Sequence, residues 1–117
     1  MDKAAIGKFG EDLACDFLKR EGYKIIERNF RIRGGEIDII ALESGVLVYI
    51  EVKTRSNHDF GLPEEAVTYH KLKFLERASK FYRVNRRNLP LQERIDVVSV
   101  DLSTSTPSIK LIKNAGF

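Results

Sequence analysis

The stretch GEIDIIALESGVLVYIEVK, residues 35–53, decides the fold that we expect for this chain. It holds two apolar runs, 37–42 and 46–52, which are joined by the turn-like residues 43–45. Short runs rich in Ile and Val on either side of a Ser-Gly turn predict a β-hairpin. Because both faces of this hairpin carry apolar side chains, we expect it to lie in the covered centre of a sheet.

Three charged residues interrupt the apolar hairpin: Asp38, Glu51 and Lys53. If Ser44 and Gly45 form a two-residue loop, counting back along both strands places Asp38 directly opposite Glu51. Opposed like charges repel, and Glu51 and Lys53 share a face because side chains alternate along a strand. Two carboxylates that converge on an apolar hairpin favour a site for a hard divalent cation. With a lysine beside them, they suggest a metal-dependent phosphodiesterase.

The plain alternative is that these charges only solvate the wet face of a surface hairpin. Against it, the other side chains on both faces are apolar, and buried charges without a role are uncommon. On one face we expect Ile37, Ile39, Val46, Val48, Ile50 and Val52, and on the face of the carboxylates Ile40, Leu47 and Tyr49. We therefore favour a functional site over a solvated face.

Composition sets the broad class of protein. The chain has 117 residues, which predicts one domain, and 43% of them are hydrophobic, which is enough to bury a core. The net charge of +3 permits a nucleic-acid partner without demanding one. Cys15 is the only cysteine, and His58 and His70 are far apart, so a zinc site is not expected. Since Asp2 and Lys3 open the chain and no long apolar run follows, we expect a soluble, cytoplasmic protein.

The remaining elements follow from hydrophobic periodicity and from chain breakers. Ile6, Phe9, Leu13 and Phe17 recur at helical spacing, and Gly22 ends that helix. Besides the hairpin, we expect a helix over 4–21, a strand over 23–30, a helix that begins within 63–68 and runs to about 85, and strands over 94–102 and 108–113. The order α-β-β-β-α-β-β predicts an α/β fold, with one mixed sheet of about five strands and a helix packed on each face.

Two sets of basic residues surround the expected site. On the second helix, the stripe is Lys73, Arg77, Lys80 and Arg87, flanked by Lys71, Arg83 and Arg86 and opposed by the core-facing Leu72, Leu75, Ser79 and Tyr82. Near the ends of the site strands lie Arg28, Arg31, Arg33 and Arg55. A solvated helix face is the plain alternative, but basic groups around paired carboxylates favour a phosphate-bearing substrate. We expect DNA contacts from Arg28, Arg31, Arg33, Arg55, Lys71, Lys73, Arg77 and Lys80. Aromatic residues interleaved at a base-stacking spacing are not evident.

Other polar residues have plain structural alternatives. Glu11 lies away from the centre of the apolar stripe of the first helix, where a solvated glutamate is usual. Glu36 shares the face of Asp38, and it stays open as a ligand, a supporting group or an exposed residue. Arg94 and Asp96 are expected to pair on one face of their strand.

The hairpin resembles the hallmark of the YraN family of bacterial proteins, through Gly35-Glu36-Ile37-Asp38-Ile39-Ile40 and Val48-Tyr49-Ile50-Glu51-Val52-Lys53-Thr54-Arg55. Further matches are Gly10-Glu11-x-x-Ala14, Gly22-Tyr23, Asn29, Phe60-Gly61, Glu65-Ala66-Val67, Lys71 and Arg94-x-Asp96-Val97. Because several separate motifs occur in order, the resemblance is specific. That family is similar to archaeal Holliday-junction resolvases and to the wider PD-(D/E)XK nuclease superfamily, which implies a restriction-endonuclease-like fold.

The resemblance also implies a cofactor and roles for particular residues. In the superfamily two carboxylates bind magnesium and a lysine assists the attacking water, roles that fall to Asp38, Glu51 and Lys53. The Val52 carbonyl is implied as a further metal ligand. Glu11 matches a helix glutamate that joins the site in the resolvase-like branch. The proline that often precedes the first carboxylate is absent before Asp38.

We therefore expect a Mg²⁺- or Mn²⁺-dependent endonuclease that hydrolyses phosphodiester bonds of DNA, with branched or junction DNA as one candidate substrate. A two-fold junction would suit a homodimer. The alternative is a non-catalytic nucleic-acid-binding module of the same fold, and a third hypothesis is an interaction protein whose acidic cluster only binds cation. The intact set Asp38, Glu51 and Lys53 favours the enzyme, because a degenerate module would be expected to lose one of them.

Overall fold

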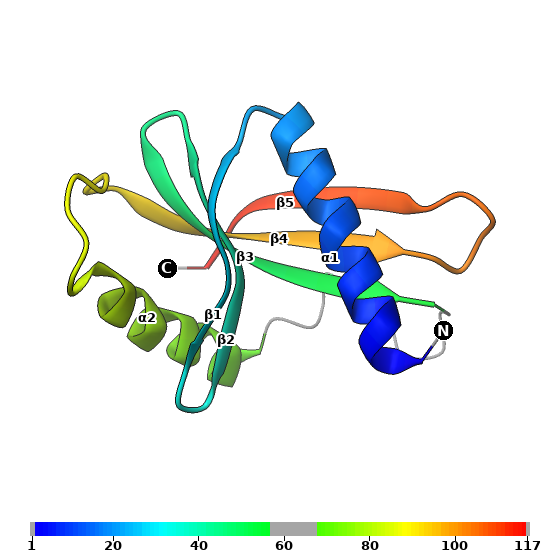
Figure 1. The fold of residues 1–117 in the computed structure, drawn as a ribbon, viewed down its shortest axis with the longest axis horizontal. Coiled ribbons are helices and arrows are strands. Elements are labelled where there is room, and N and C mark those ends of the chain that lie inside the picture. The colour runs from blue at the N-terminus through cyan, green and yellow to red at the C-terminus, as the bar shows by residue number, and fades with distance from the viewer. Residues whose placement is uncertain (1, 57–67, 117) are drawn as a thin grey trace.

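The computed structural model describes residues 2–56 and 68–116 of the chain (Figure 1). Its elements are α1 Lys3–Arg20, β1 Lys24–Ile32, β2 Gly35–Glu43, β3 Val46–Arg55, α2 Tyr69–Arg83, β4 Glu93–Asp101 and β5 Ser108–Gly116. The predicted order α-β-β-β-α-β-β and the predicted α/β class are therefore confirmed. His58 and the motifs Phe60-Gly61 and Glu65-Ala66-Val67 lie outside the described residues.

The five strands form one mixed sheet in chain order, from β1 to β5. β3 and β4 pair in parallel, whereas the other neighbouring strands are antiparallel. The parallel pair follows from the crossover that includes α2, since a tight turn joins only antiparallel strands. β3, which carries Glu51 and Lys53, therefore occupies the centre of the sheet.

The hairpin of β2 and β3 has the predicted register and turn. Glu43 pairs with Val46, and the two loop residues Ser44 and Gly45 both have positive φ, at 51° and 76°. Positive φ at both positions is typical of a type I′ turn, whose twist matches that of the flanking strands. The turn therefore sets the alignment of everything further along the two strands.

The hairpin opens at its far end, where the charged residues lie. Backbone pairing stops at Ile39 and Ile50, so Asp38 and Glu51 occupy the next position of the predicted register. The expected alternation also breaks at Asp38, because Ile37 packs into the core under α2 and Ile39 packs under α1. The prediction that Ile37 and Ile39 share a face was wrong. Side chains alternate only where pairing is regular, and the pairing with β1 passes from Ile39 directly to Ile37.

Each face of the sheet is covered by one helix, as predicted (Figure 1). The core under α1 includes Ala14, Leu18, Ile39, Val48 and Ile50. The core under α2 includes Ile40, Leu47, Tyr49, Leu75 and Ile95. Leu75, Ser79 and Tyr82 face this second core as predicted, and Phe74 and Ala78 join them from the same side of the helix.

Capping residues fix where the two helices begin. The side chain of Asp2 accepts a hydrogen bond from the backbone N–H of Ala5 at 2.8 Å, and that of Thr68 accepts one from Lys71 at 3.1 Å. α2 accordingly begins at Tyr69, just beyond the expected window 63–68, and Lys71 lies in its first turn. Within the described part of the chain, neither helix combines the length and the hydrophobicity that crossing a membrane requires.

α1 packs against the sheet at Gly10, which is buried. A Cβ at this position would overlap the side chain of Thr54 at the end of β3. Only glycine lets the helix lie this close, and the contact places Glu11, the next residue, beside the site strands.

The predicted pair of Arg94 and Asp96 is confirmed and belongs to the fold. Asp96 is fully buried. It accepts hydrogen bonds from Arg94 Nε at 2.9 Å, from the Tyr23 hydroxyl at 2.8 Å and from the backbone N–H of Asn114 at 2.9 Å. Because each of these donors is itself part of the packed sheet or its cover, we assign this cluster a structural role.

Candidate active site

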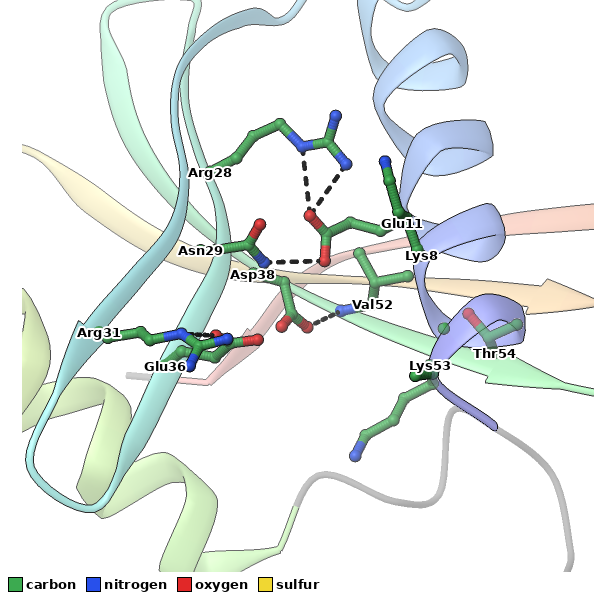
Figure 2. A pocket seen from close by; sticks show the side chains of 12 residues that line it. Lys8, Glu11, Arg28, Asn29, Arg31, Glu36, Asp38, Val52, Lys53 and Thr54 are labelled. Atoms are coloured by element: carbon green, nitrogen blue, oxygen red, sulfur yellow. Dashed lines mark hydrogen bonds and ion pairs between the residues drawn. The ribbon is translucent and has the colours of Figure 1, made fainter. Parts of the chain in front are cut away.

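A pocket of about 870 Å³ lies between α1 and the strands β1, β2 and β3 (Figure 2). It contains most of the polar residues that the sequence singled out. They are Lys8 and Glu11 from α1, Arg28 and Asn29 from β1, Glu36 and Asp38 from β2, and Val52 and Lys53 from β3. The pocket therefore lies over the end of the hairpin where the strands separate.

Asp38 points into this pocket from β2 (Figure 2). Its Oδ2 accepts a hydrogen bond from the backbone N–H of Val52 at 2.8 Å. The pKa of Asp38 is raised from 3.8 to about 7, first by burial and then by repulsion from the Glu51 carboxylate. The Val52 hydrogen bond and the charge of Lys71 oppose this rise. A carboxyl that titrates near neutral pH in a pocket is typical of a functional site.

Glu51 is buried, with 5% of its surface exposed, and it makes two ion pairs. Lys53 Nζ lies 3.3 Å from Glu51 Oε1, which confirms that these residues share a face. Lys71 Nζ lies 3.2 Å from Oε2. Oε2 nevertheless accepts no hydrogen bond from the described residues. Glu51 thus has its charge neutralised while one of its oxygens keeps an unused acceptor.

Lys71 reaches the site from α2, which sequence reasoning missed. We expected it beside the basic stripe of the helix, but its Nζ contacts both Glu51 Oε2 and the backbone carbonyl oxygen of Glu36, each at 3.2 Å. The ring of Phe74 lies 5.1 Å from the same nitrogen. Thr68, the N-cap three residues before Lys71, is the sequence signal that places Lys71 in the first turn of α2. How that turn docks on the sheet is a tertiary feature that the sequence pattern does not give.

Glu11 lines the pocket from α1, and its carboxylate is held by β1 (Figure 2). Arg28 donates to Oε1 from Nε and Nη2, at 3.2 and 3.0 Å, and Asn29 donates to Oε2 at 3.0 Å. Asn29 has a φ of 53°, which is unusual in a strand. Consecutive side chains of β1 therefore reach the same helix instead of alternating. Sequence reasoning gave Asn29 no role, and the structure makes it part of the pocket wall.

The other strand-end arginines are held to different degrees. Arg31 Nε pairs with Glu36 Oε2 at 2.9 Å on an exposed rim, and Glu36 lines the pocket beside Asp38. Arg33 lies on the exposed turn between β1 and β2. Arg55 is half-buried, and its Nη1 is shielded from solvent and forms no hydrogen bond with the described residues. Arg33 is thus more accessible to a large substrate than Arg55.

Three residues of the predicted basic stripe lie on the outer face of α2, whereas the fourth, Arg87, lies beyond the end of the helix at Arg83, so its placement on the stripe was wrong. Lys73, Arg77 and Lys80 are all exposed. Lys73 Nζ is 3.8 Å from Glu76 Oε2, and Arg77 Nη2 donates to the backbone carbonyl oxygen of Arg33 at 3.2 Å. These contacts leave most of their charge open to solvent.

The donors at the pocket fit a hard divalent cation. Asp38 and Val52 line the pocket, and Glu51 lies close enough to Asp38 to raise the pKa of that carboxyl. The two side chains supply carboxylate oxygens, which Mg²⁺ and Mn²⁺ prefer. The raised pKa of Asp38 indicates a local need for positive charge, and Glu51 Oε2 forms no hydrogen bond with the described residues although Lys71 Nζ lies 3.2 Å away. Within residues 2–56 and 68–116, no three acidic, His or Cys side chains cluster closely enough to hold an ion by themselves. An ion would depend on the two carboxylates, the backbone and water, which suits the waters that magnesium retains.

Comparison with known proteins finds relatives along nearly the whole chain. Residues 10–100 match the model of the "Uncharacterised protein family UPF0102". A "UPF0102 protein" from Geobacter metallireducens is 43% identical over 111 residues, which is 95% of this chain and 91% of the relative. Proteins of the same name from Caldicellulosiruptor saccharolyticus and from Clostridium botulinum strain Loch Maree are 42% and 45% identical. They cover 98% and 94% of this chain, and the matches span 99% and 92% of their own lengths. These names state no activity.

Proposed function

The chain belongs to the uncharacterised protein family UPF0102, and we propose that it is a Mg²⁺- or Mn²⁺-dependent endonuclease that hydrolyses phosphodiester bonds of DNA. The observation that carries the proposal is that Asp38, which lines the pocket, lies close enough to the buried Glu51 for the Glu51 carboxylate to raise its pKa. Lys53 and Lys71 bring positive charge to the same place. This combination suits an anionic phosphodiester far better than a neutral substrate.

The two carboxylates and one lysine divide the chemical work. A divalent cation on Asp38 and Glu51, with the Val52 carbonyl as a further ligand, would supply an ionised water at neutral pH and neutralise charge on the phosphate. Lys53 lines the pocket and is 30% exposed, so its ammonium can reach a substrate phosphate without leaving the neighbourhood of Glu51. There it would stabilise the negative charge that develops as the phosphodiester bond breaks.

The remaining polar residues position this machinery. Lys71 contacts both Glu51 and the backbone of β2, so it neutralises that carboxylate when no cation is bound and links α2 to the site. Glu11 is fixed by Arg28 and Asn29 at the pocket wall, where its carboxylate would orient water rather than move toward the substrate.

A non-catalytic nucleic-acid-binding module is the competing function. The double ion pairing of Glu51 favours it, because Lys53 and Lys71 already neutralise that carboxylate without a cation. The raised pKa of Asp38 favours the enzyme, because a buried, repelled carboxyl destabilises the fold and a module that only binds DNA has no use for it.

Cleavage of labelled DNA separates the two functions. Linear, single-stranded, flap and four-way-junction substrates are incubated with the purified protein and Mg²⁺ or Mn²⁺. We expect cleavage of at least one substrate, and a loss of about a hundredfold or more in both Asp38→Asn and Glu51→Gln. Asp16→Asn, which removes an exposed carboxylate on α1, is the matched control and should keep full activity. Equal cleavage by all four proteins would mean a contaminating nuclease, and no cleavage of any substrate would favour the binding module.

A further inference from the structure

The outer face of α2 exposes large apolar side chains to an unusual degree. Tyr69 is 69% exposed and Phe81 is 57% exposed, and Val84, the C-cap of the helix, is 70% exposed. Only two other large hydrophobic residues are exposed in the described part of the chain, Phe9 and Leu91. Exposed rings that gather on one element indicate a binding surface more often than chance placement does.

These rings alternate with basic residues along one stripe of the helix. Tyr69, Lys73, Arg77 and Phe81 follow one another at intervals of four, so they lie on one side of α2. Lys80 lies beside Phe81, and Lys73 Nζ is 5.5 Å from the centre of the Tyr69 ring. Residue spacing alone did not indicate this interleaving of rings and basic side chains. The pattern becomes visible in the structure, where the helix begins at Tyr69 and buries Phe74 and Ala78 against the core, so that Tyr69 and Phe81 remain on the outer face.

A shallow cavity of about 520 Å³ adjoins the stripe at its middle. Its walls are Arg77 and Phe81 of α2 and the turn Ile32-Arg33-Gly34 between β1 and β2. Arg77 Nη2 donates to the backbone carbonyl oxygen of Arg33, and a Cβ at Gly34 would lie 2.9 Å from the same nitrogen. The cavity thus combines the ring of Phe81, the guanidinium groups of Arg33 and Arg77, and the backbone at Gly34, which carries no side chain. Such a lining suits a flat, partly polar group that lies next to an anion.

We propose that this stripe, formed by Tyr69, Lys73, Arg77, Lys80 and Phe81, binds the unpaired nucleotides of a DNA strand. Bases stack on the two rings and phosphates contact the three basic side chains. Stacking on exposed aromatic residues next to basic groups is how proteins hold single strands without reading their sequence. The proposal rests on the proposed function only in taking DNA as the polymer.

Charge decides against a second copy of this chain as the occupant. In a two-fold dimer the same patch meets itself, so Lys73, Arg77 and Lys80 of one copy would face their equivalents. Glu76 is the one acidic residue among these positions of α2, and it already lies 3.8 Å from Lys73. A polyanion satisfies the same surface without this repulsion.

The N-terminal end of the stripe lies in the same helical turn as a residue of the candidate site. Tyr69 precedes Lys71 by two residues, and Lys71 Nζ contacts Glu51. A strand bound along the stripe and continued past the N-terminal end of α2 (Figure 1) would therefore come close to Lys71 and Glu51. The substrate that fits is DNA with an unpaired segment next to the bond that is cut, such as a flap or an overhang.

The test measures binding in chelator, where nothing is cleaved. Fluorescence anisotropy follows fluorescein-labelled oligothymidylate, and its duplex with oligoadenylate, as each binds the full chain. We expect Tyr69→Leu and Phe81→Leu each to weaken single-strand binding about tenfold and to change duplex binding by less than about twofold. Phe81→Tyr keeps the ring and should bind as the wild type does. Phe9→Leu, which removes an exposed ring on α1, should also change nothing.

Variants that remove the positive charges test the phosphate contacts independently of the rings. Lys73→Gln and Lys80→Gln should weaken single-strand and duplex binding alike, with a salt slope on single strands that falls by about 0.7 for each residue.

Three results would overturn the proposal. The first is unchanged single-strand affinity in the double variant Tyr69→Leu/Phe81→Leu. The second is an equal loss for single strands and duplex in that variant. The third is a wild-type dimer that Phe81→Leu converts to monomer without any effect on DNA. Failure here is separate from failure of the nuclease proposal, because ring-dependent binding without any metal-dependent cleavage would leave this inference standing.

Discussion

Replacing Asp38 with Asn should stabilise the metal-free protein, and the gain should grow with pH. The pKa of this carboxyl is raised to about 7 in the folded chain, chiefly by burial and then by Glu51. In the unfolded chain it returns to the ordinary value of 3.8. Between these two values the folded state binds the extra proton, so stability falls as pH rises from about 4 to about 7 and is level above that. Asn carries no charge at any pH and escapes this loss.

The structure sets an upper limit on the gain. Each unit of difference between the folded and unfolded pKa corresponds to about 1.4 kcal/mol of unfolding free energy. If the whole shift of Asp38 appeared as lost stability, Asp38→Asn would gain about 4 kcal/mol above pH 7. The observed gain should be smaller, because Asp38 is only partly enclosed and Lys53 and Lys71 lie near the pair. The side-chain oxygen of Asn can still accept the hydrogen bond from Val52, so that contact is kept. We expect a gain of about 1–2 kcal/mol at pH 8 and none at pH 4.

Urea unfolding in chelator at pH 4, 6 and 8 measures this directly for the wild type, Asp38→Asn and the control Asp16→Asn. The control removes an exposed carboxylate and should track the wild type at every pH. Added Mn²⁺ should then reverse the order, since a bound cation stabilises only the protein that keeps both carboxylates. A loss of stability in Asp38→Asn at pH 8 in chelator would refute the reasoning, because it would show that Asp38 is a structural group.

Three further changes probe separate parts of the account. Lys53→Ala should leave DNA binding in chelator nearly unchanged and lower the rate of cleavage at saturating DNA about a hundredfold, as measured in single turnovers. Equal losses of DNA affinity and of cleavage rate would show that Lys53 acts in binding. Lys71→Met should tighten Mn²⁺ binding about threefold to tenfold in calorimetry, because it removes a positive charge that opposes the cation; weaker binding would mean that Lys71 is needed to build the site. Gly10→Ala should cost about 1–3 kcal/mol in urea unfolding, because its Cβ would overlap Thr54, whereas Gly7→Ala meets nothing and should cost no stability.

The features that the sequence predicted well are those set by local chemistry. The Ser44-Gly45 loop has few ways to join two strands, so it set the register in which Asp38 and Glu51 follow the paired residues Ile39 and Ile50. The ion pair of Glu51 and Lys53 follows from strand geometry, because side chains two residues apart on a strand share a face. Helix and strand order followed from hydrophobic periodicity in the same way.

The features that it missed depend on how elements dock. Lys71 looked like one more surface lysine until α2 was placed against β3. Asn29 gained its role from a positive φ within a strand, and Ile37 changed faces because the pairing is irregular at Asp38. The exposed rings on α2 became visible only when the buried side of the helix was known. None of these follows from residue spacing, because each depends on tertiary contacts that override the regular pattern.

Calorimetric titration of Mn²⁺ tests most directly the claim that Asp38 and Glu51 act together as a cation site. We expect one site in the wild type, with a dissociation constant in the micromolar to millimolar range because few carboxylates contribute. Binding should disappear in Asp38→Asn and in Glu51→Gln, and it should be unchanged in Asp16→Asn. Unaltered Mn²⁺ binding in both site variants would place the cation elsewhere and contradict the account.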